Sequence, residues 1–161
     1  MQEYRNNNQQ NQGFNNRNQP QQRNAGYQTQ QDSAAERKFK ELHYNPEWIT
    51  KEADDKLVKY AEDSGKFMAT KGLTNSKIRS IYGEIKRIQM GEFEQEKSAF
   101  VLLKPKVAYA LGRDDRNEGL KLFKLIFDCS SQNVTDQKSF NNFCNFMEAI
   151  LAYHKANGGK D

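Results

Sequence analysis

The stretch SFNNFCNFMEAILAY, residues 139–153, bears most directly on the fold. At about 100° of rotation per residue in a helix, its apolar side chains cover roughly half of the circumference. Those side chains are Phe140, Phe143, Cys144, Phe146, Met147, Ile150, Leu151 and Tyr153. A surface helix needs a narrower stripe, so the pattern predicts a central core helix over about residues 137–156. Thr135 or Asp136 is expected to begin it and Gly158-Gly159 to end it. The alternative is that part of this wide face contacts another subunit.

Four further helices are predicted from apolar periodicity upstream of this stretch. They cover about residues 51–71, 75–90, 92–111 and 116–129. The third contains Pro105, whose ring removes a hydrogen-bond donor and should kink the helix. Asn45-Pro46 is predicted to begin a turn or a short helix. No run of alternating β-branched residues indicates a strand, so the expected fold class is all-α, a compact bundle of about five helices with a disordered N-terminal tail.

Capping residues set the expected ends of these helices. Thr50 and Thr74 are the predicted N-caps of the first two, and Asp114-Asp115 is predicted to cap the fourth. Glycine favours the left-handed conformation that follows many helices. Two glycines are therefore expected to end the first two helices: Gly72 and Gly91.

The N-terminal segment has a strongly biased composition, since residues 1–31 hold ten Gln and eight Asn and almost no aliphatic side chains. Such a segment buries too little apolar area to offset the entropy cost of ordering. We therefore expect a disordered tail over residues 1–35 and a single helical domain over residues 36–161. Gln/Asn tracts can also self-associate, and the arginines of the tail could touch nucleic acid weakly. These are Arg5, Arg17 and Arg23.

The cysteines and the apolar segments indicate the compartment. Neither Cys129 nor Cys144 has a partner at CxxC spacing, and nothing indicates a disulfide framework. The first residues, MQEYRNNNQQ, lack the apolar core of a secretory signal. No segment approaches the roughly 18–20 consecutive apolar residues of a membrane span. We therefore expect a cytoplasmic protein in a reducing compartment, without membrane contact.

The basic charge is concentrated in the middle of the chain. The whole sequence carries a net charge of +4, whereas residues 66–106 alone contain nine Lys or Arg and four Asp or Glu, a net of +5. A local basic field favours partners that carry phosphate or other anionic groups.

The predicted helix over residues 75–90 has an isoleucine stripe and a basic flank. Its core stripe consists of Ile78, Ile81, Ile85 and Ile88. Arg79 and Lys86 stand one above the other on one flank, about 10 Å apart at about 1.5 Å per residue. Tyr82 and Gly83 lie on either side of them. Glycine costs about 1 kcal/mol relative to alanine inside a helix, so Gly83 could allow another backbone to approach. The remaining cations point elsewhere on the wheel: Lys77 and Arg87.

The helix over residues 92–111 repeats this arrangement. Lys106, Tyr109 and Arg113 share one flank beside its apolar stripe, whereas Lys104 lies on the opposite edge. If the two helices join near a glycine turn, four cations would share one basic groove: Arg79, Lys86, Lys106 and Arg113. Cations along a groove release counterions from a polyanion and bind its backbone without regard to sequence. The alternative is that each flank is only solvated.

Catalytic signals are weak. His43 falls in an expected loop, and His154 lies on the apolar side of the last helix, where packing accounts for it. The motifs HExxH and GxSxG and the glycine-rich phosphate loops do not occur. We expect no enzymatic activity, no catalytic residue, no bound metal and no cofactor.

Three stretches together resemble a known family. They are LTNSKIRSIYGEIKRI (residues 73–88), FVLLKPKVAYALGR (residues 100–113) and SFNNFCNFMEAILAYHK (residues 139–155), the last followed after a short gap by GGKD. Their order, spacing and helical setting resemble the small subunit of type III-A CRISPR–Cas effector complexes, a Csm-type helical protein, over roughly residues 48–161. The family usually has Gln at the position of Lys77, so no role is transferred to that residue.

The resemblance implies a compact helical bundle without catalytic activity that acts in antiviral defence. Copies of it stack head to tail among the other subunits of the effector complex, and contact mainly the backbone of guide RNA and target RNA. The expected RNA-binding residues are Arg79, Lys86, Arg87, Lys104, Lys106, Tyr109 and Arg113. The helix over residues 137–156 and the aromatic segment around Trp48 are expected to supply the two faces that head-to-tail stacking needs.

Two other functions fit parts of the sequence. Gly72-Leu73-Thr74 between two helices resembles the entry of a helix-turn-helix in a DNA-binding regulator, with Asn75, Ser76 and Arg79 as candidate readers. Against it, the apolar stripe of this helix starts at once and leaves one usable flank. The remaining alternative is a purely structural interaction module whose charges only solvate it.

Overall fold

The computed structural model describes residues 31–159, which contain eight helices and no strand. The helices are α1 (Ala34–Leu42), α2 (Glu47–Thr50), α3 (Asp55–Thr70), α4 (Asn75–Gln89), α5 (Phe93–Val101), α6 (Leu103–Gly112), α7 (Glu118–Ser131) and α8 (Gln137–Ala156). None of the helices in this part of the chain is long and apolar enough to cross a membrane. The all-α prediction is confirmed. The predicted tail falls mainly on residues 1–30, outside the described residues, and α1 begins at Ala34, ahead of the predicted domain start at residue 36.

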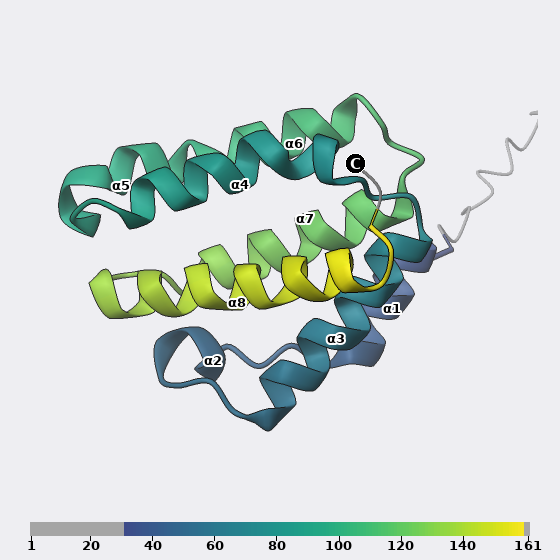
Figure 1. The fold of residues 1–161 in the computed structure, drawn as a ribbon, viewed down its shortest axis with the longest axis horizontal. Helices are drawn as coiled ribbons and strands as arrows, with labels where there is room; N and C mark the ends of the chain where they lie inside the picture. Colours follow the sequence, from purple (N-terminus) through teal and green to yellow (C-terminus); the bar gives the residue numbers. More distant parts are fainter. Residues whose placement is uncertain (1–30, 160–161) are drawn as a thin grey trace, which may run out of the picture. The chain divides into compact units, whose positions relative to one another are not determined.

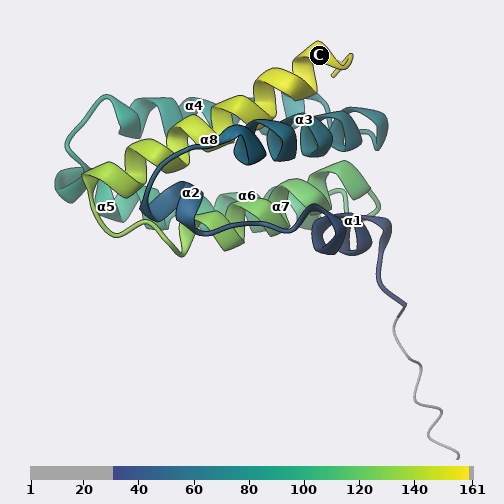
Figure 2. The same ribbon diagram turned by 90° about the horizontal axis from the view of Figure 1, so that it is seen from below.

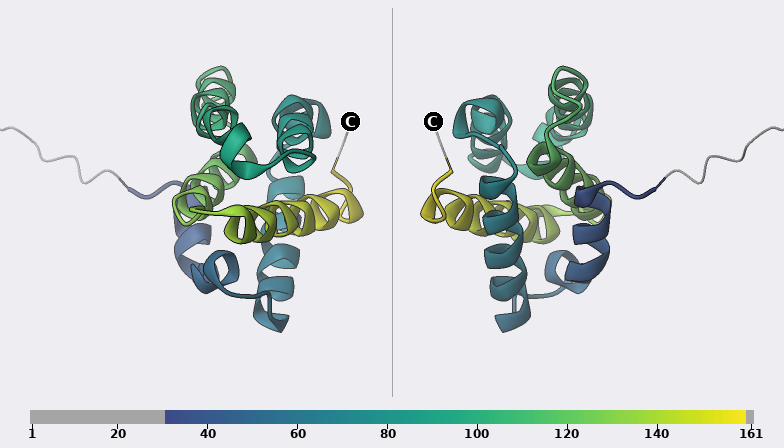
Figure 3. Two further views of the ribbon diagram at one scale, coloured as in Figure 1. Left: turned by 90° about the vertical axis from the view of Figure 1, so that its left-hand side faces the viewer. Right: turned by 90° about the vertical axis from the view of Figure 1, so that its right-hand side faces the viewer.

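Within residues 31–159, α7 and α8 lie between two other groups of helices (Figure 1). α4, α5 and α6 cover one side, and α1, α2 and α3 cover the other, as the views along the helices also show (Figure 3). α3 is the main partner of α8 and packs against it (Figure 2). This arrangement leaves α4 and α6 as neighbours on one surface, where the candidate site lies.

α8 is the central helix that the apolar pattern predicted, with the predicted bounds. Asp136 is its N-cap, since the carboxylate accepts a hydrogen bond from the N–H of Ser139 at 2.8 Å. The Ser139 hydroxyl in turn accepts from the N–H of Asp136 at 3.0 Å, which completes a capping box. The rings of Phe140, Phe143 and Phe146 are fully buried. The wide apolar face is therefore covered by this chain itself.

The chain buries Trp48 and the apolar face of α8, whose elements were predicted to supply the stacking faces, and stacking through them stays a prediction. Trp48 is 3% exposed. Its ring centroid lies 5.1 Å from that of Tyr60 and 6.0 Å from that of Phe146. Its indole N–H donates to the carboxylate of Asp54 at 2.8 Å. Large apolar side chains are exposed elsewhere in the described part of the chain, at Val58, Met90, Val101, Leu102 and Tyr109.

The predicted N-cap at Thr50 is wrong. Thr50 ends the short helix α2, which follows Asn45-Pro46 as expected, and α3 begins only at Asp55. Asp54 caps α3, because its carboxylate accepts the N–H of Leu57 at 2.8 Å. The Asp54 carboxylate also accepts the indole N–H of Trp48, which holds it in place. Asp54 is therefore a better cap for α3 than Thr50, which already lies inside α2.

The predicted cap at Asp114-Asp115 is also wrong. α7 begins at Glu118, and the side-chain oxygen of Asn117 accepts the N–H of Leu120 at 2.9 Å. The amide nitrogen of Asn117 donates to the carbonyl of Gly72 at 2.8 Å. Asn117 thus caps α7 and ties it to the α3–α4 connection.

The kink predicted from Pro105 appears as a one-residue interruption between two helices. α5 ends at Val101 and α6 begins at Leu103, with Leu102 between them. Pro105 has no N–H to bond the carbonyl of Val101, and its ring crowds that carbonyl. The chain therefore ends one helix and starts another about one turn before the proline.

The α3–α4 connection is held from inside the bundle. Gly72 has a φ of +87°, a conformation that glycine adopts readily. The next residue, Leu73, is buried, and its carbonyl accepts a hydrogen bond from Nε2 of His154 at 2.8 Å. His154 is itself fully buried, so its predicted packing role is confirmed.

Candidate nucleic-acid interface

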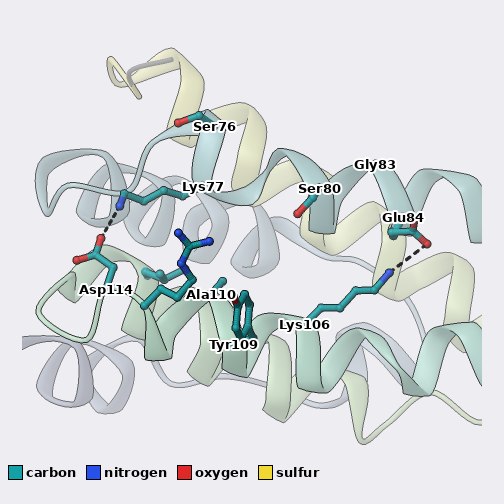
Figure 4. A pocket seen from close by; sticks show the side chains of 11 residues that line it. Ser76, Lys77, Ser80, Gly83, Glu84, Lys106, Tyr109, Ala110 and Asp114 are labelled. Carbon is teal, nitrogen blue, oxygen red and sulfur yellow. Dashed lines mark hydrogen bonds and ion pairs between the residues drawn. The ribbon is translucent and has the colours of Figure 1, made fainter.

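A groove of about 720 Å³ lies between α4 and α6 (Figure 4). It is lined by Ser76, Lys77, Ser80, Gly83 and Glu84 of α4, by Lys106, Tyr109, Ala110, Arg113 and Asp114 of α6 and the turn after it, and by Leu120 of α7. The lining holds three bases and two serine hydroxyls, which can bind phosphate oxygens by charge and by hydrogen bonds, and two acids, which repel phosphate. In residues 31–159, no group of three or more His, Cys, Asp or Glu side chains is placed to hold a metal ion.

The α6 side of the groove matches the sequence prediction. Lys106, Tyr109 and Arg113 line it together, because they follow one another at helical spacing on one face. The guanidinium of Arg113 lies 5.8 Å from the centroid of the Tyr109 ring, and this tyrosine is 68% exposed. Arg113 forms no ion pair with any other described residue, so its charge is available to a ligand.

The α4 side of the groove is not the flank that the sequence predicted. Lys77, Ser80 and Glu84 line the groove against α6, whereas Arg79 lines a second groove against α8 and Lys86 pairs with α8. α4 has a polar flank on each side of its isoleucine stripe, and a helical wheel does not show which neighbour covers which flank. The prediction that four cations share one groove is therefore wrong, because two of the four lie on the far side of α4.

Lys77 is the groove cation that the sequence prediction set aside. Its Nζ lies 2.5 Å from Oδ2 of Asp114. Hydrogen bonds from Lys77 and then from Asn117 lower the pKa of the Asp114 carboxyl. The available signal was its wheel position, since Lys77 shares its flank with Ser80 and Glu84 at helical spacing.

A second ion pair crosses the groove from α6 to α4. Nζ of Lys106 lies 3.6 Å from Oε2 of Glu84. Glu84 also accepts a hydrogen bond from Nε of Arg87 at 3.3 Å, and this bond together with the charge of Lys106 lowers the pKa of Glu84. Such partly exposed pairs contribute little to stability. A phosphate can therefore take the place of the carboxylate at small cost.

The other flank of α4 faces α8 across a groove of about 410 Å³. Arg79, Tyr82 and Lys155 line it together with Glu148. Lys86 donates to Glu148 at 2.6 Å, and this bond raises the pKa of Lys86. The ring of Tyr82 lies 5.7 Å from the same ammonium group. A carboxylate of α8 thus already holds Lys86.

Arg87 and Lys104 line neither groove. Arg87 donates to Glu96 at 3.1 Å and to Glu84 at 3.3 Å, and these two bonds raise its pKa. The bond to Glu96 links α4 to α5. Lys104 is exposed near the start of α6 and has no ion pair within the described ranges. Of the predicted RNA-binding residues, only the three of the α6 side share the α4–α6 groove.

The candidate readers of the helix-turn-helix alternative do not share a face. Asn75 and Arg79 line the groove against α8, whereas Ser76 lines the groove against α6. A recognition helix presents its readers together to one DNA groove. The division of these three side chains does not favour DNA reading by α4.

Comparison with known proteins adds a family to this geometry. The family model described as Csm2 Type III-A matches residues 51–160. This range includes all helices from α3 to α8, and with them both grooves. No curated protein and no solved structure matches the chain.

Proposed function

Because the chain belongs to the Csm2 Type III-A family, the small subunits of type III-A CRISPR–Cas effector complexes, we propose that it holds RNA by its backbone along the α4–α6 groove. Membership implies that it associates with other subunits of such a complex. The proposed ligands are guide RNA and target RNA, and the proposed role is binding without catalysis. A cytoplasmic setting is part of the proposal, and the two free thiols, Cys129 and Cys144, fit it.

The observation that carries this proposal is the row of cations on the α6 side of the groove. Lys106 and Arg113 line it, and Lys77 lies across from them on α4. A guanidinium can hold a phosphate through two parallel hydrogen bonds, and Arg113 has no competing carboxylate among the described residues. Ser76 and Ser80 add hydroxyl donors to the same lining. These groups recognise a sugar–phosphate backbone rather than the edges of bases.

Backbone binding is sufficient for a subunit of an RNA-guided complex. In such complexes base pairing between guide and target reads the sequence, and protein reads shape and charge. The groove then needs no side chain that reads base edges. Cations that release a carboxylate and bind a phosphate in its place are sufficient for backbone binding.

We also propose that copies of the chain stack on one another. Head-to-tail stacking joins two different faces of each copy. The exposed apolar side chains around the α4–α5 turn and the α5–α6 break support one such face, since interfaces cover apolar patches. These are Met90, which is 90% exposed, Val101 and Leu102.

Salt-dependent RNA binding by the full chain tests the proposal. Lys106 and Arg113 are changed together to Ala, and affinity for two RNAs of unrelated sequence is measured between low and moderate salt. We expect weaker binding of both RNAs, and a slope of log K against log salt that is shallower by about 1.4, for two single-strand phosphate contacts at about 0.7 each.

Two matched variants make the test specific. Lys56 and Lys66 are exposed cations of α3 outside both grooves, and their double change to Ala removes the same charge. The double change of Arg79 and Lys86 probes the α8 flank of α4. If either control matches the loss caused by Lys106→Ala with Arg113→Ala, the α4–α6 groove is not the RNA site.

A further inference from the structure

We propose that the α4–α6 groove takes an unpaired nucleotide, whose base stacks on Tyr109 while its flanking phosphates lie on Lys106 and Arg113. This inference rests on the proposed function and adds to it the form of RNA that the groove accepts. Contacts to phosphates alone would bind a strand in a duplex as well as an unpaired strand. A stacking platform suits only a nucleotide whose base is free of its neighbours.

Tyr109 is exposed without a reason in the chain's own packing. Tyr109 is 68% exposed and is not among the apolar side chains that form or pack against the hydrophobic core. Its hydroxyl makes no hydrogen bond to any other described residue. The ring extends from α6 toward α4, between the Lys77–Asp114 and Lys106–Glu84 ion pairs (Figure 4). A large aromatic surface at the middle of a charged groove is typical of a contact with something outside the chain.

The cations beside Tyr109 are spaced for the phosphates of a single strand. Lys106 precedes the tyrosine by about one helical turn and Arg113 follows it by about one turn. The Arg113 guanidinium already lies 5.8 Å from the ring centroid, so the charge and the aromatic face act at one place. Aromatic rings interleaved with cations are the pattern of sequence-tolerant single-strand binding.

The opposite wall leaves room for the base. Gly83, Ser80 and Ser76 are the small residues of α4 that line the groove. A Cβ added at Gly83 would meet no atom within 4 Å, so the chain's own packing does not require glycine there. Glycine is unfavourable inside a helix, and an outside group that occupies this space would account for it. The volume of about 720 Å³ lies within the range of pockets that enclose a small ligand.

Three RNAs of equal length test the proposal with the full chain. The first is a single strand of uridines, the second is the same strand with abasic riboses, and the third is a fully paired duplex. We expect the intact single strand to bind about 5- to 150-fold more tightly than the abasic strand, the factor for stacking of one base on an aromatic side chain. The duplex should bind like the abasic strand at equal salt.

Variants of the tyrosine assign this difference to one ring. Tyr109→Leu should lose the preference for intact over abasic RNA, and should leave abasic affinity and the salt slope unchanged. Tyr109→Phe should keep the preference, because the ring remains. Tyr82→Leu, on the α8 flank of α4, is the matched control and should also keep it.

The outcomes separate this inference from the function on which it rests. Equal, salt-dependent binding of intact and abasic strands by the wild-type chain would overturn stacking and leave backbone binding standing. If Tyr109→Leu weakens binding of the intact and the abasic strand equally, stacking on Tyr109 is overturned too. If no RNA binds at all, both proposals fail, and the exposed tyrosine then belongs to a protein contact.

Discussion

Glu84 and Lys106 face each other across the α4–α6 groove, with 3.6 Å between Oε2 and Nζ. The same carboxylate accepts a hydrogen bond from Arg87, so one acid on α4 holds two cations. A phosphate that enters the groove must compete with this carboxylate for Lys106. The acids of the groove therefore tune its affinity for RNA as much as the cations do.

Glu84→Gln should strengthen RNA binding. The change releases Lys106 and Arg87 from a carboxylate while keeping a side chain of similar size. We expect about two- to five-fold tighter binding at low salt, as for one exposed ion pair, and a steeper salt dependence. Fluorescence anisotropy with a labelled single-stranded RNA measures both quantities.

Glu62→Gln is the matched control for this variant. Glu62 lies on α3 and pairs with Lys59, so its loss changes the net charge equally but away from the groove. Equal gains in affinity for Glu62→Gln and Glu84→Gln would show that only net charge matters.

Gly83→Ala and Gly65→Ala should change stability in opposite directions. At Gly83 the added Cβ has no neighbour within 4 Å, so helix propensity alone acts and the free energy of unfolding should rise by about 0.5–1 kcal/mol. At Gly65 the Cβ would lie 2.6 Å from the backbone nitrogen of His154, because α3 and α8 approach closely there. We expect a loss of about 1–3 kcal/mol, measured by urea unfolding. A destabilised Gly83→Ala variant would contradict the open space seen beside this residue.

Asn117→Ala should destabilise the chain far more than Thr74→Ala. Asn117 is buried, caps α7 through Leu120 and donates to the carbonyl of Gly72, so its loss should cost about 1–3 kcal/mol. Thr74 stands at the N-cap of α4, but its hydroxyl bonds Ser76 and accepts no backbone N–H. Its replacement should stay within about 0.5 kcal/mol of the wild type. Thermal and urea unfolding of both variants measure the two effects. Similar losses of stability would show that Asn117 neither caps α7 nor ties it to the α3–α4 connection in an energetically important way.

Acid should weaken the start of α8. Hydrogen bonds from the backbone N–H and the hydroxyl of Ser139 lower the pKa of Asp136. A carboxyl with a lowered folded-state pKa stabilises the fold above its unfolded pKa of about 3.9, and this contribution is lost as pH falls through the folded value. Stability should therefore decline below about pH 4.

Asp136→Asn isolates this contribution. Asparagine can still cap the helix but does not titrate. The urea midpoint of the variant should fall less between pH 5 and pH 3 than that of the wild type. Parallel declines in the two proteins would assign the acid sensitivity to other carboxylates.

Much of the fold could be predicted from local patterns. The apolar residues of α8 predicted its bounds and its central position, since the width of an apolar face depends only on helical geometry. The isoleucines of α4 are all buried as its wheel indicated. The errors lie at N-caps, where Asp54 and Asn117 compete with nearby residues of similar propensity. A cap is chosen by which side chain reaches a free N–H, and that depends on packing around it.

The candidate site divides in the same way. The sequence by itself determined that Lys106, Tyr109 and Arg113 share a face, because residues three and four apart in one helix must do so. Only the tertiary structure decided that this face meets Lys77 rather than Arg79. Lys77 and Asp114 are 37 positions apart, and Lys86 and Glu148 are 62 apart. Helical periodicity places side chains around one axis, whereas the neighbour on each flank follows from how the whole core packs.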